Sequence, residues 1–247
     1  MPFQPSTTPI TPNSLQLTRL GLVNCYLVRE EGSVTEPASF TLIDTGLPGS
    51  ASDILAAAKA AGAPIRRILL THAHSDHVGS VDALVKKLNT QGITPQFAAS
   101  ARSIPLLAQP PNKSLLPGEP HGTIKGGLPG IKTPLTHTLT PGELFGSLRV
   151  LETPGHIPGH LSFLDERDGT LFAGDALVAI GKLAVSGFGP WYFPFPNLVT
   201  WSKPTAVASV RALANLPADV PLERFACGHG AIRSGGRTAL TQILATA

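Results

Sequence analysis

The chain has 247 residues, a hydrophobic content of 42% that can support a sizeable core, and a small net charge of +3. No apolar stretch reaches about 18 residues, so we expect neither a membrane span nor a membrane partner. The 19 basic residues are scattered and form no dense run, which argues against a nucleic-acid partner despite a pI near 9.0.

The first quarter of the chain combines a polar start with strand and helix patterns. Residues 1–13 are rich in Pro, Thr and Ser and do not resemble a secretion signal, so we expect a cytoplasmic protein. Apolar residues alternate or cluster as in strands over residues 15–20, 22–28 and 40–44. An Ala-rich segment over residues 52–61, followed by Gly62, predicts a helix.

Residues 72–77 hold a cluster of imidazoles and carboxylate after a predicted buried strand at 65–70. His72, His74 and Asp76 follow the strand's period of two, whereas His77 needs a turn to join them. Such groups are costly to bring together unless they are paired or bind a metal, and this donor set suits zinc and its neighbours. A solvated polar loop is the alternative interpretation.

A helical repeat of apolar residues follows at 78–88, and its N-terminal dipole is expected to face the cluster. Residues 110–134 are dense in Pro and Gly and too long for a simple connector, so we expect them to shape the substrate site. Further helices are predicted over 205–216 and 237–244.

Three downstream strands end in a glycine next to a ligand-type residue, where the backbone can turn sharply. They are predicted over residues 148–152, 170–173 and 224–227. With the first cluster they supply the candidate metal ligands His72, His74, Asp76, His77, His156, Asp175 and His229. Because both halves must fold to bring these ligands together, we expect residues 1–247 to form a single domain.

Residues 187–196 concentrate five aromatic side chains between Asp175 and His229. One interpretation makes Phe188, Trp191 and Tyr192 an apolar wall for an acyl or aromatic substrate, and the other anchors them in the core.

Four side chains elsewhere have other expected roles. His160 is a candidate to support the ligands, whereas His121 and His137 are expected at the surface or in loops. Cys227 and Cys25 are expected to be buried free thiols, with a metal-ligand role for Cys227 as the alternative.

The His-x-His-x-Asp-His motif at residues 72–77 resembles the signature of the metallo-β-lactamase superfamily, and the resemblance extends from residues 24–27 and 42–46 to 228–230. It implies that Asp175 bridges two metals and that Asp44 supports the ligands from behind. It assigns three ligands to each metal: His72, His74 and His156 to the first, and Asp76, His77 and His229 to the second.

The fold expected from both arguments belongs to the α/β class. The strands lack one clean βαβ period, so two sheets packed face to face with helices outside fit better than a single doubly wound sheet. The resemblance implies the same architecture, a four-layer αββα sandwich.

Two zinc ions about 3.5–4 Å apart would lower the pKa of a shared water towards about 7 and so supply a hydroxide. Mn²⁺, Co²⁺ and Fe²⁺ are the alternatives to zinc. Asp76 would orient the nucleophile and relay a proton in catalysis, and no Gly-x-Ser-x-Gly motif competes with this mechanism. The sequence therefore predicts a dinuclear zinc-dependent hydrolase with a small-molecule substrate and leaves the oligomeric state open.

We expect a small ester or lactone as the substrate, and several alternatives remain. Glyoxalase II-like thioesterases carry an added C-terminal segment, for which residues 230–247 are too few, and acyl-homoserine lactonases tend to have Tyr where this chain has Val178. β-Lactamase and organophosphate hydrolase activities use the same site. A mononuclear iron persulfide dioxygenase would use His72, His156 and Asp175, and a non-catalytic metal-binding module is the last alternative.

Overall fold

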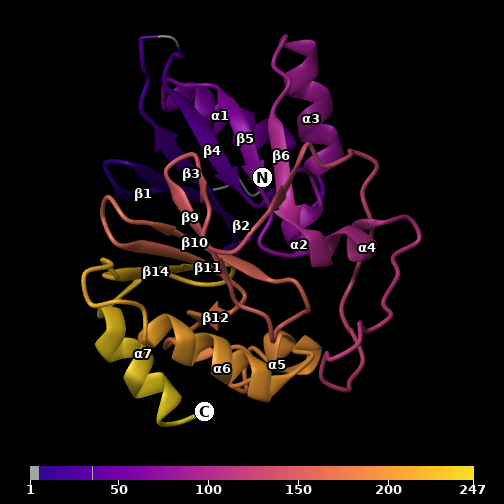
Figure 1. Cartoon of the computed structure of the whole chain (residues 1–247). Coiled ribbons are helices and arrows are strands. Elements are labelled where there is room, and N and C mark those ends of the chain that lie inside the picture. Colours follow the sequence, from indigo (N-terminus) through magenta and orange to yellow (C-terminus); the bar gives the residue numbers. More distant parts are fainter. Residues whose placement is uncertain (1–5, 35) are drawn as a thin grey trace.

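Two β-sheets pack face to face at the centre of the molecule, and helices cover both outer faces (Figure 1). The structure is a computed structural model that describes residues 6–34 and 36–247. The predicted four-layer αββα sandwich is confirmed.

The first sheet follows chain order from β1 to β7, antiparallel up to β4 and parallel from β4 onward. Its strands are β1 (Ser6–Thr11), β2 (Ser14–Arg19), β3 (Val23–Glu30), β4 (Ser39–Ile43), β5 (Ile65–Leu69), β6 (Gln96–Ser100) and β7 (His137–Leu139). The predicted strands correspond to β2–β5. β1 was not predicted, and its Pro9 is tolerated because β1 lies at the sheet edge.

The second sheet has the order β15-β14-β11-β10-β9-β8, and only β11 and β14 pair in parallel. Its strands are β8 (Leu144–Phe145), β9 (Leu148–Glu152), β10 (Leu161–Asp165), β11 (Thr170–Gly174), β14 (Arg224–Cys227) and β15 (Arg233–Ser234). A separate short hairpin joins β12 (Leu177–Val178) to β13 (Ala184–Val185).

The helices divide between the two outer layers. On the side of the first sheet are α1 (Ala51–Ala60), α3 (Val81–Thr90), the 3₁₀ turn Ala101–Ser103 and α4 (Ile104–Leu107). On the side of the second sheet are α5 (Phe195–Val199), α6 (Lys203–Ala214) and α7 (Gly236–Leu244). Within the described residues, no helix is long and apolar enough to cross a membrane.

The alternation of side chains along the strands creates separate apolar layers. In β3, Tyr26 and Val28 pack between the sheets with Phe163 and Phe172 of the second sheet. Leu27 points the other way, into the cluster that α1 and α3 cover. A third cluster joins the second sheet to α6 and α7.

The prediction of one helix starting at Val78 was wrong. The chain forms a single turn, α2 (Ser75–Val78), and then α3 from Val81. Between them the N–H of Gly79 donates to the carbonyl of Gly46 at 3.1 Å, and the N–H of Ser80 donates to Thr45 Oγ1 at 3.2 Å. These bonds to the loop after β4 interrupt the helix, so the dipole of α3 does not begin at the ligand cluster.

Candidate metal centre

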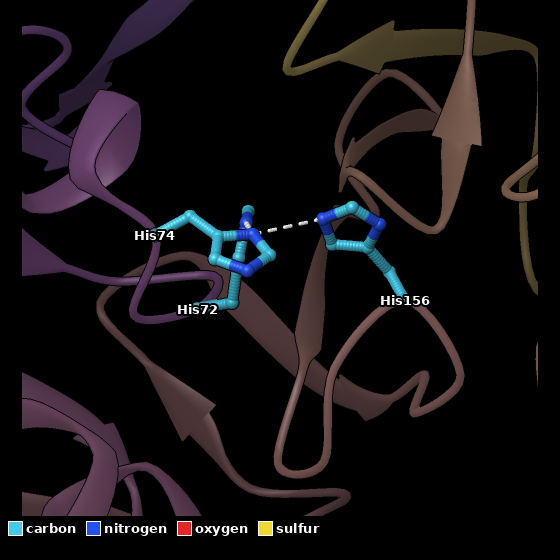
Figure 2. A group of neighbouring side chains, drawn as sticks. All are labelled: His72, His74 and His156. Atoms are coloured by element: carbon cyan, nitrogen blue, oxygen red, sulfur yellow. Dashed lines mark hydrogen bonds between the residues drawn. The ribbon is translucent and has the colours of Figure 1, made fainter. Parts of the chain in front are cut away.

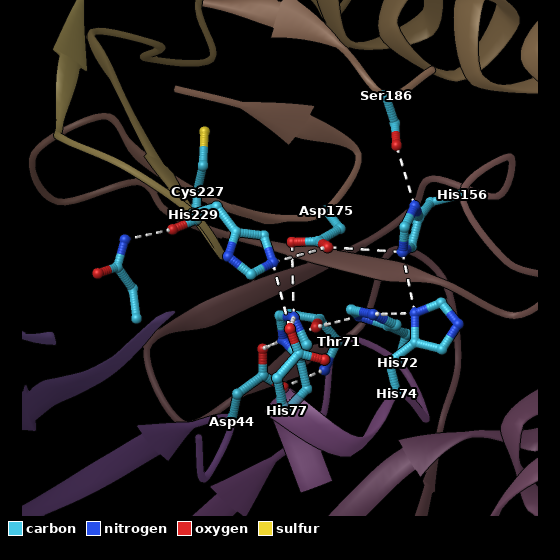
Figure 3. Close-up of polar contacts among 12 residues, drawn as sticks. Asp44, Thr71, His72, His74, His77, His156, Asp175, Ser186, Cys227 and His229 are labelled. Carbon is cyan, nitrogen blue, oxygen red and sulfur yellow. Dashed lines mark hydrogen bonds and ion pairs between the residues drawn. The ribbon is translucent and has the colours of Figure 1, made fainter. Parts of the chain in front are cut away.

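The seven candidate ligands meet at one edge of the sandwich, where segments from both sheets end (Figure 3). The segment after β5, including α2, supplies four of them, and the second sheet supplies the others from the β9–β10 loop and from the ends of β11 and β14. Distances between their ligand atoms, all within 4.8 Å inside a group, place them in three overlapping groups: His72, His74 and His156; His72, His77 and Asp175; and Asp76, His77 and His229.

Three ring nitrogens converge in the first group (Figure 2). The Nδ1 atom of His74 lies 3.0 Å from Nε2 of His72 and 3.0 Å from Nε2 of His156. All three side chains are buried, with His72 fully excluded from solvent.

Hydrogen bonds on the outer side of these rings determine which nitrogen carries the proton. Nε2 of His74 lies 3.0 Å from the carbonyl of Lys125, which can only accept, so His74 donates there and its Nδ1 carries a lone pair. The backbone at Lys125 can approach His74 closely because the next residue is Gly126, at φ +87°. A Cβ at that position would lie 2.5 Å from His74 Nε2.

A chain of hydroxyl groups orients His156 in the same way. Thr200 Oγ1 donates to the carbonyl of Pro196, so it accepts from Ser186 Oγ at 3.0 Å. Ser186 in turn accepts from Nδ1 of His156 at 3.0 Å, which leaves the lone pair on Nε2. His156 is thereby fixed to the segment that carries α5.

Asp44 supports both the first group and the group of Asp76, His77 and His229, which we call the second group. This buried residue adopts φ +59° and accepts from the N–H and hydroxyl of Thr71 at 2.8 and 2.7 Å and from Nδ1 of His77 at 2.7 Å. Because the Thr71 hydroxyl donates to Asp44, it accepts from Nδ1 of His72 at 3.0 Å. One carboxylate therefore orients a histidine of each group.

The carboxylate of Asp175 lies between the two groups (Figure 3). Its Oδ2 is 3.5 Å from Nε2 of His156 and 3.3 Å from Nε2 of His229, and its Oδ1 is 3.5 Å from Nε2 of His77. Asp76 Oδ2 reaches Nε2 of His229 at 3.3 Å. Nδ1 of His229 donates to the carbonyl of Leu22 at 3.1 Å, so its Nε2 also faces the site.

This arrangement fits two cations. Lone pairs of His72, His74 and His156 meet at 3.0 Å without a proton between them. His77 Nε2 and Asp175 Oδ1 are buried without a hydrogen-bond partner among the described residues. Buried groups of this kind are costly unless something binds them, and a cation in each group would satisfy them.

The environment shifts the pKa values of the two groups in opposite directions. Burial lowers the pKa of His72, His74 and His156, so these rings are neutral at pH 7. Burial also disfavours the charged forms of His77 and His229, but the attraction of nearby carboxylates outweighs it. Among these carboxylates, Asp44 has the largest effect on His77 and Asp175 the largest effect on His229. The pKa of His77 is raised, and that of His229 is raised to about 10.

The two carboxylates remain ionised despite their burial. Burial alone would raise the pKa of Asp76 and Asp175, but His77 and His229 hold both below their ordinary range. Two ionised carboxylates therefore face the position where a second cation would bind, next to His77 and His229, which must lose a proton first.

A glycine permits the close approach of the last strand. A Cβ on Gly228 would collide with Asp175 Oδ1 and lie 2.6 Å from His77 Cε1. The expectation that glycines at these junctions allow close packing around the ligands agrees with this contact.

A cavity of about 340 Å³ opens onto the ligands. Much of its lining is apolar, with Leu22, Leu47, Phe193, Phe195 and Val199 among the lining residues. Gly126 and Gly127 of the long irregular segment line it as well. The ring of Phe193 lies 5.6 Å from that of His229, so an apolar substrate group would lie next to the second ligand group.

The other predicted aromatics lie outside this lining. Phe188 packs against the apolar cluster of the second sheet, beneath Lys203. Trp191 and Tyr192 are 87% and 56% exposed, and their rings contact each other. In this structure Phe193 and Phe195 of the same segment reach the cavity, and a substrate role for Phe188, Trp191 and Tyr192 stays a prediction.

His160 contacts a ligand from behind. Its Nε2 accepts from the backbone N–H of Asp175 at 3.0 Å, and its Nδ1 donates to Thr153 Oγ1 at 2.9 Å. Burial lowers the pKa of His160 to about 3, so the ring stays neutral. His121 and His137 lie at the surface, where His137 pairs with Glu143.

Both cysteines are buried and free. The side chain of Cys227 belongs to the apolar cluster of the second sheet, and its sulfur points away from the ligands (Figure 3). Its carbonyl instead accepts hydrogen bonds from Asn24 and Tyr26.

The fold and site together define a metal-binding protein of the two-sheet α/β sandwich type. The chain belongs to the metallo-β-lactamase superfamily, whose family model matches residues 18–229.

Three curated relatives are informative. Protein YobT of Bacillus subtilis is 47% identical over 84% of this chain and 83% of its own length. The probable metallo-hydrolase YflN of Bacillus subtilis is 29% identical over 90% of this chain and 86% of its own length. Hydroxyacylglutathione hydrolase of Halorhodospira halophila is 31% identical over 66% of this chain, and the match covers 46% of the relative.

Among solved structures, TTHA1623 in a di-iron-bound form is 27% identical, with a TM-score of 0.60 over 88% of this chain and 92% of that one.

The sequence contained no local signal for several supporting groups. Ser186 and Thr200 are isolated hydroxyls, and the carbonyls of Leu22 and Lys125 depend only on backbone position. Thr71 directly precedes the ligand motif, and this position next to His72 was the one available indication of its role.

Proposed function

We propose that the protein is a hydrolase of small, uncharged esters or lactones that uses two Zn²⁺ ions. The observation that carries the proposal is the composition of the cavity, which combines an apolar wall with a convergent set of nitrogen and carboxylate ligands. When bound, two such ions would supply a hydroxide at neutral pH and polarise the scissile carbonyl.

The protein's own residues would position the reactants. Asp76 lines the cavity and is held ionised, so it can accept a hydrogen bond from the nucleophile and orient it. Asp175 would bridge the two groups, since its oxygens face both. Phe193 and Phe195 would hold the apolar part of the substrate and exclude water.

The charge of the cavity favours an uncharged substrate. Among the described residues that line it, there is no Lys or Arg, and the ionisable ones are all candidate ligands. A glutathione thioester or a β-lactam carries carboxylates that would find no Lys or Arg among the described residues of this lining. A neutral ester or lactone needs only the two cations and the apolar wall.

Metal content and metal dependence test the chemistry. Chelation should abolish hydrolysis, and Zn²⁺, Co²⁺ or Mn²⁺ should restore it. Elemental analysis of protein purified without added metal should find about two ions per chain. Full activity in verified metal-free protein would refute the mechanism, and one tightly bound iron with oxygen uptake on a persulfide would instead support the dioxygenase.

A substrate panel tests specificity. We expect neutral esters and lactones to show the highest kcat/KM, ahead of a glutathione thioester, a β-lactam and a phosphotriester. Phe193→Ala should raise KM for substrates with bulky apolar groups, because losing an apolar contact removes about 1–3 kcal/mol of discrimination. Leu144→Ala, at an exposed site in β8, is the matched control.

Hydrolysis of glutathione thioesters is the second candidate, because hydroxyacylglutathione hydrolases are among the relatives. This chain spans about half the length of the one from Halorhodospira halophila. A kcat/KM for a glutathione thioester above that of every neutral ester would select this activity over the first.

A further inference from the structure

Large apolar side chains are exposed in the segments that contribute to the lining of the metal cavity. Six of them lie in two segments, the turn between β2 and β3 and the segment from Gly187 to Val199. We refer to these six as the apolar rim: Leu20, Leu22, Trp191, Tyr192, Phe195 and Leu198. Their exposed fractions range from 41% for Leu22 to 87% for Trp191.

The rim borders the cavity from two sides. Leu22 and Phe195 both line the cavity and are also exposed, so each of the two segments reaches the cavity. Phe195 and Leu198 lie three residues apart in α5 and so share a face. The bond from His229 Nδ1 to the carbonyl of Leu22 ties the first segment to the ligands.

Basic residues lie close to the second rim segment, whereas at the first segment Arg19 is paired with Asp53 at 3.9 Å. Residues 176–218 contain no Asp or Glu, although they include Lys182 and Lys203. The Tyr192 hydroxyl lies against Gly181, directly before the exposed Lys182, and Arg233 donates to the Gly181 carbonyl at 2.5 Å. Lys203 Nζ lies 5.0 Å from the ring centre of Phe188.

We propose that the apolar rim docks on the surface of an anionic phospholipid layer. Exposed Trp and Tyr carry an apolar body and a polar tip, which suits the boundary between lipid and water. Neighbouring Lys and Arg would bind anionic headgroups while their stems lie along apolar surface. A second copy of the chain is a poorer occupant, because two basic faces would repel each other.

Such docking needs no membrane span. The expectation of no membrane partner rested on the absence of a long apolar stretch, and that criterion does not address a folded surface that binds at the interface. The docked cavity would open towards the lipid, where neutral apolar molecules concentrate. The binding itself does not depend on the proposed hydrolysis.

Tryptophan fluorescence offers a direct test, because Trp191 is 87% exposed and Trp201 only 8%. Vesicles of phosphatidylcholine with phosphatidylglycerol should shift the emission to shorter wavelength and sediment the protein, whereas pure phosphatidylcholine should do so weakly. Lys182→Gln and Lys203→Gln should each weaken binding about fivefold, and added salt should weaken it further.

The double variant Leu20→Ser/Leu198→Ser should weaken vesicle binding about tenfold or more, because it removes two exposed apolar side chains that would be buried in the lipid on docking. Leu144→Ser, 60% exposed in β8, should bind like the parent. Absence of binding to anionic vesicles would overturn the proposal, as would equal losses in the Leu144 control. A stable dimer that the rim variants convert to monomer would identify a second copy as the occupant and overturn it as well.

Discussion

Raising the pH should strengthen binding of the second cation far more than binding of the first. His229 and His77 must lose a proton before they can bind a metal, and their pKa values are raised. His72, His74 and His156 already present lone pairs at pH 7, because burial lowers their pKa values. The two sites therefore differ in how strongly protons compete with metal.

The size of the effect follows from the pKa of His229, which is about 10 against an ordinary value of 6.5. Displacing one proton makes the apparent affinity rise about tenfold per pH unit below that pKa. Between pH 7 and pH 10 the gain is about 10³-fold, or about 4 kcal/mol. Protonation of His77 would add to this slope, whereas the first site should show a slope near zero.

Calorimetric titration with Zn²⁺ between pH 6.5 and 8.5 measures both slopes. Repeating it in buffers with different ionisation enthalpies counts the protons released by each cation. At pH 6.5 substoichiometric metal should load one site per chain, with the second filling only at higher concentration. His229→Gln should reduce proton release by about one. Equal pH dependence at both sites, or no proton release with the second cation, would refute the assignment.

Substitutions of ligands and of the residues that orient them test the geometry of the site. Asp175→Ala should weaken both cations because its oxygens face both groups, whereas His74→Ala should mainly weaken one; metal content measured together with kcat separates these outcomes. Asp44→Asn should lower metal affinity at both sites by about 10–100-fold, since the carboxylate orients a histidine in each, and unchanged occupancy at either site would contradict this role. Thr200→Val should weaken the first cation and lower kcat by breaking the hydroxyl chain to His156, while Thr200→Ser keeps the hydroxyl and should behave like the parent in the same chelator competition.

The architecture could be predicted from the strands that the sequence does mark, together with the resemblance of its ligand motif to the superfamily. The buried strands β3, β4, β5, β9, β11 and β14 alternate or cluster apolar residues, and the glycines after several of them mark where ligands leave a sheet. β6 and β10 were missed, and both are five-residue segments whose polar positions are also buried or paired within a sheet. Tertiary packing, rather than local pattern, sets those elements.

The candidate ligands were predictable for a similar reason, since each follows a recognisable strand. The supporting contacts were not, because Ser186, Thr200 and the Lys125 carbonyl reach the ligands from segments 30 to 51 residues away in the chain. The aromatic segment shows the same limit. Its composition indicated apolar contact with a substrate or the core. Only the three-dimensional path of the chain shows that Phe193 lines the cavity whereas Trp191 is exposed.

The positions of the ligands along the chain also fix the order in which the two ligand groups are completed during synthesis. The ligands of residues 72–77 leave the ribosome well before His156, and His229 leaves after all the others. The first group has all its ligands in the chain once residue 156 has been made, whereas the second group stays incomplete until His229, after β14, has been made. A chain interrupted before that strand therefore lacks both a ligand of the second group and the parallel partner of β11.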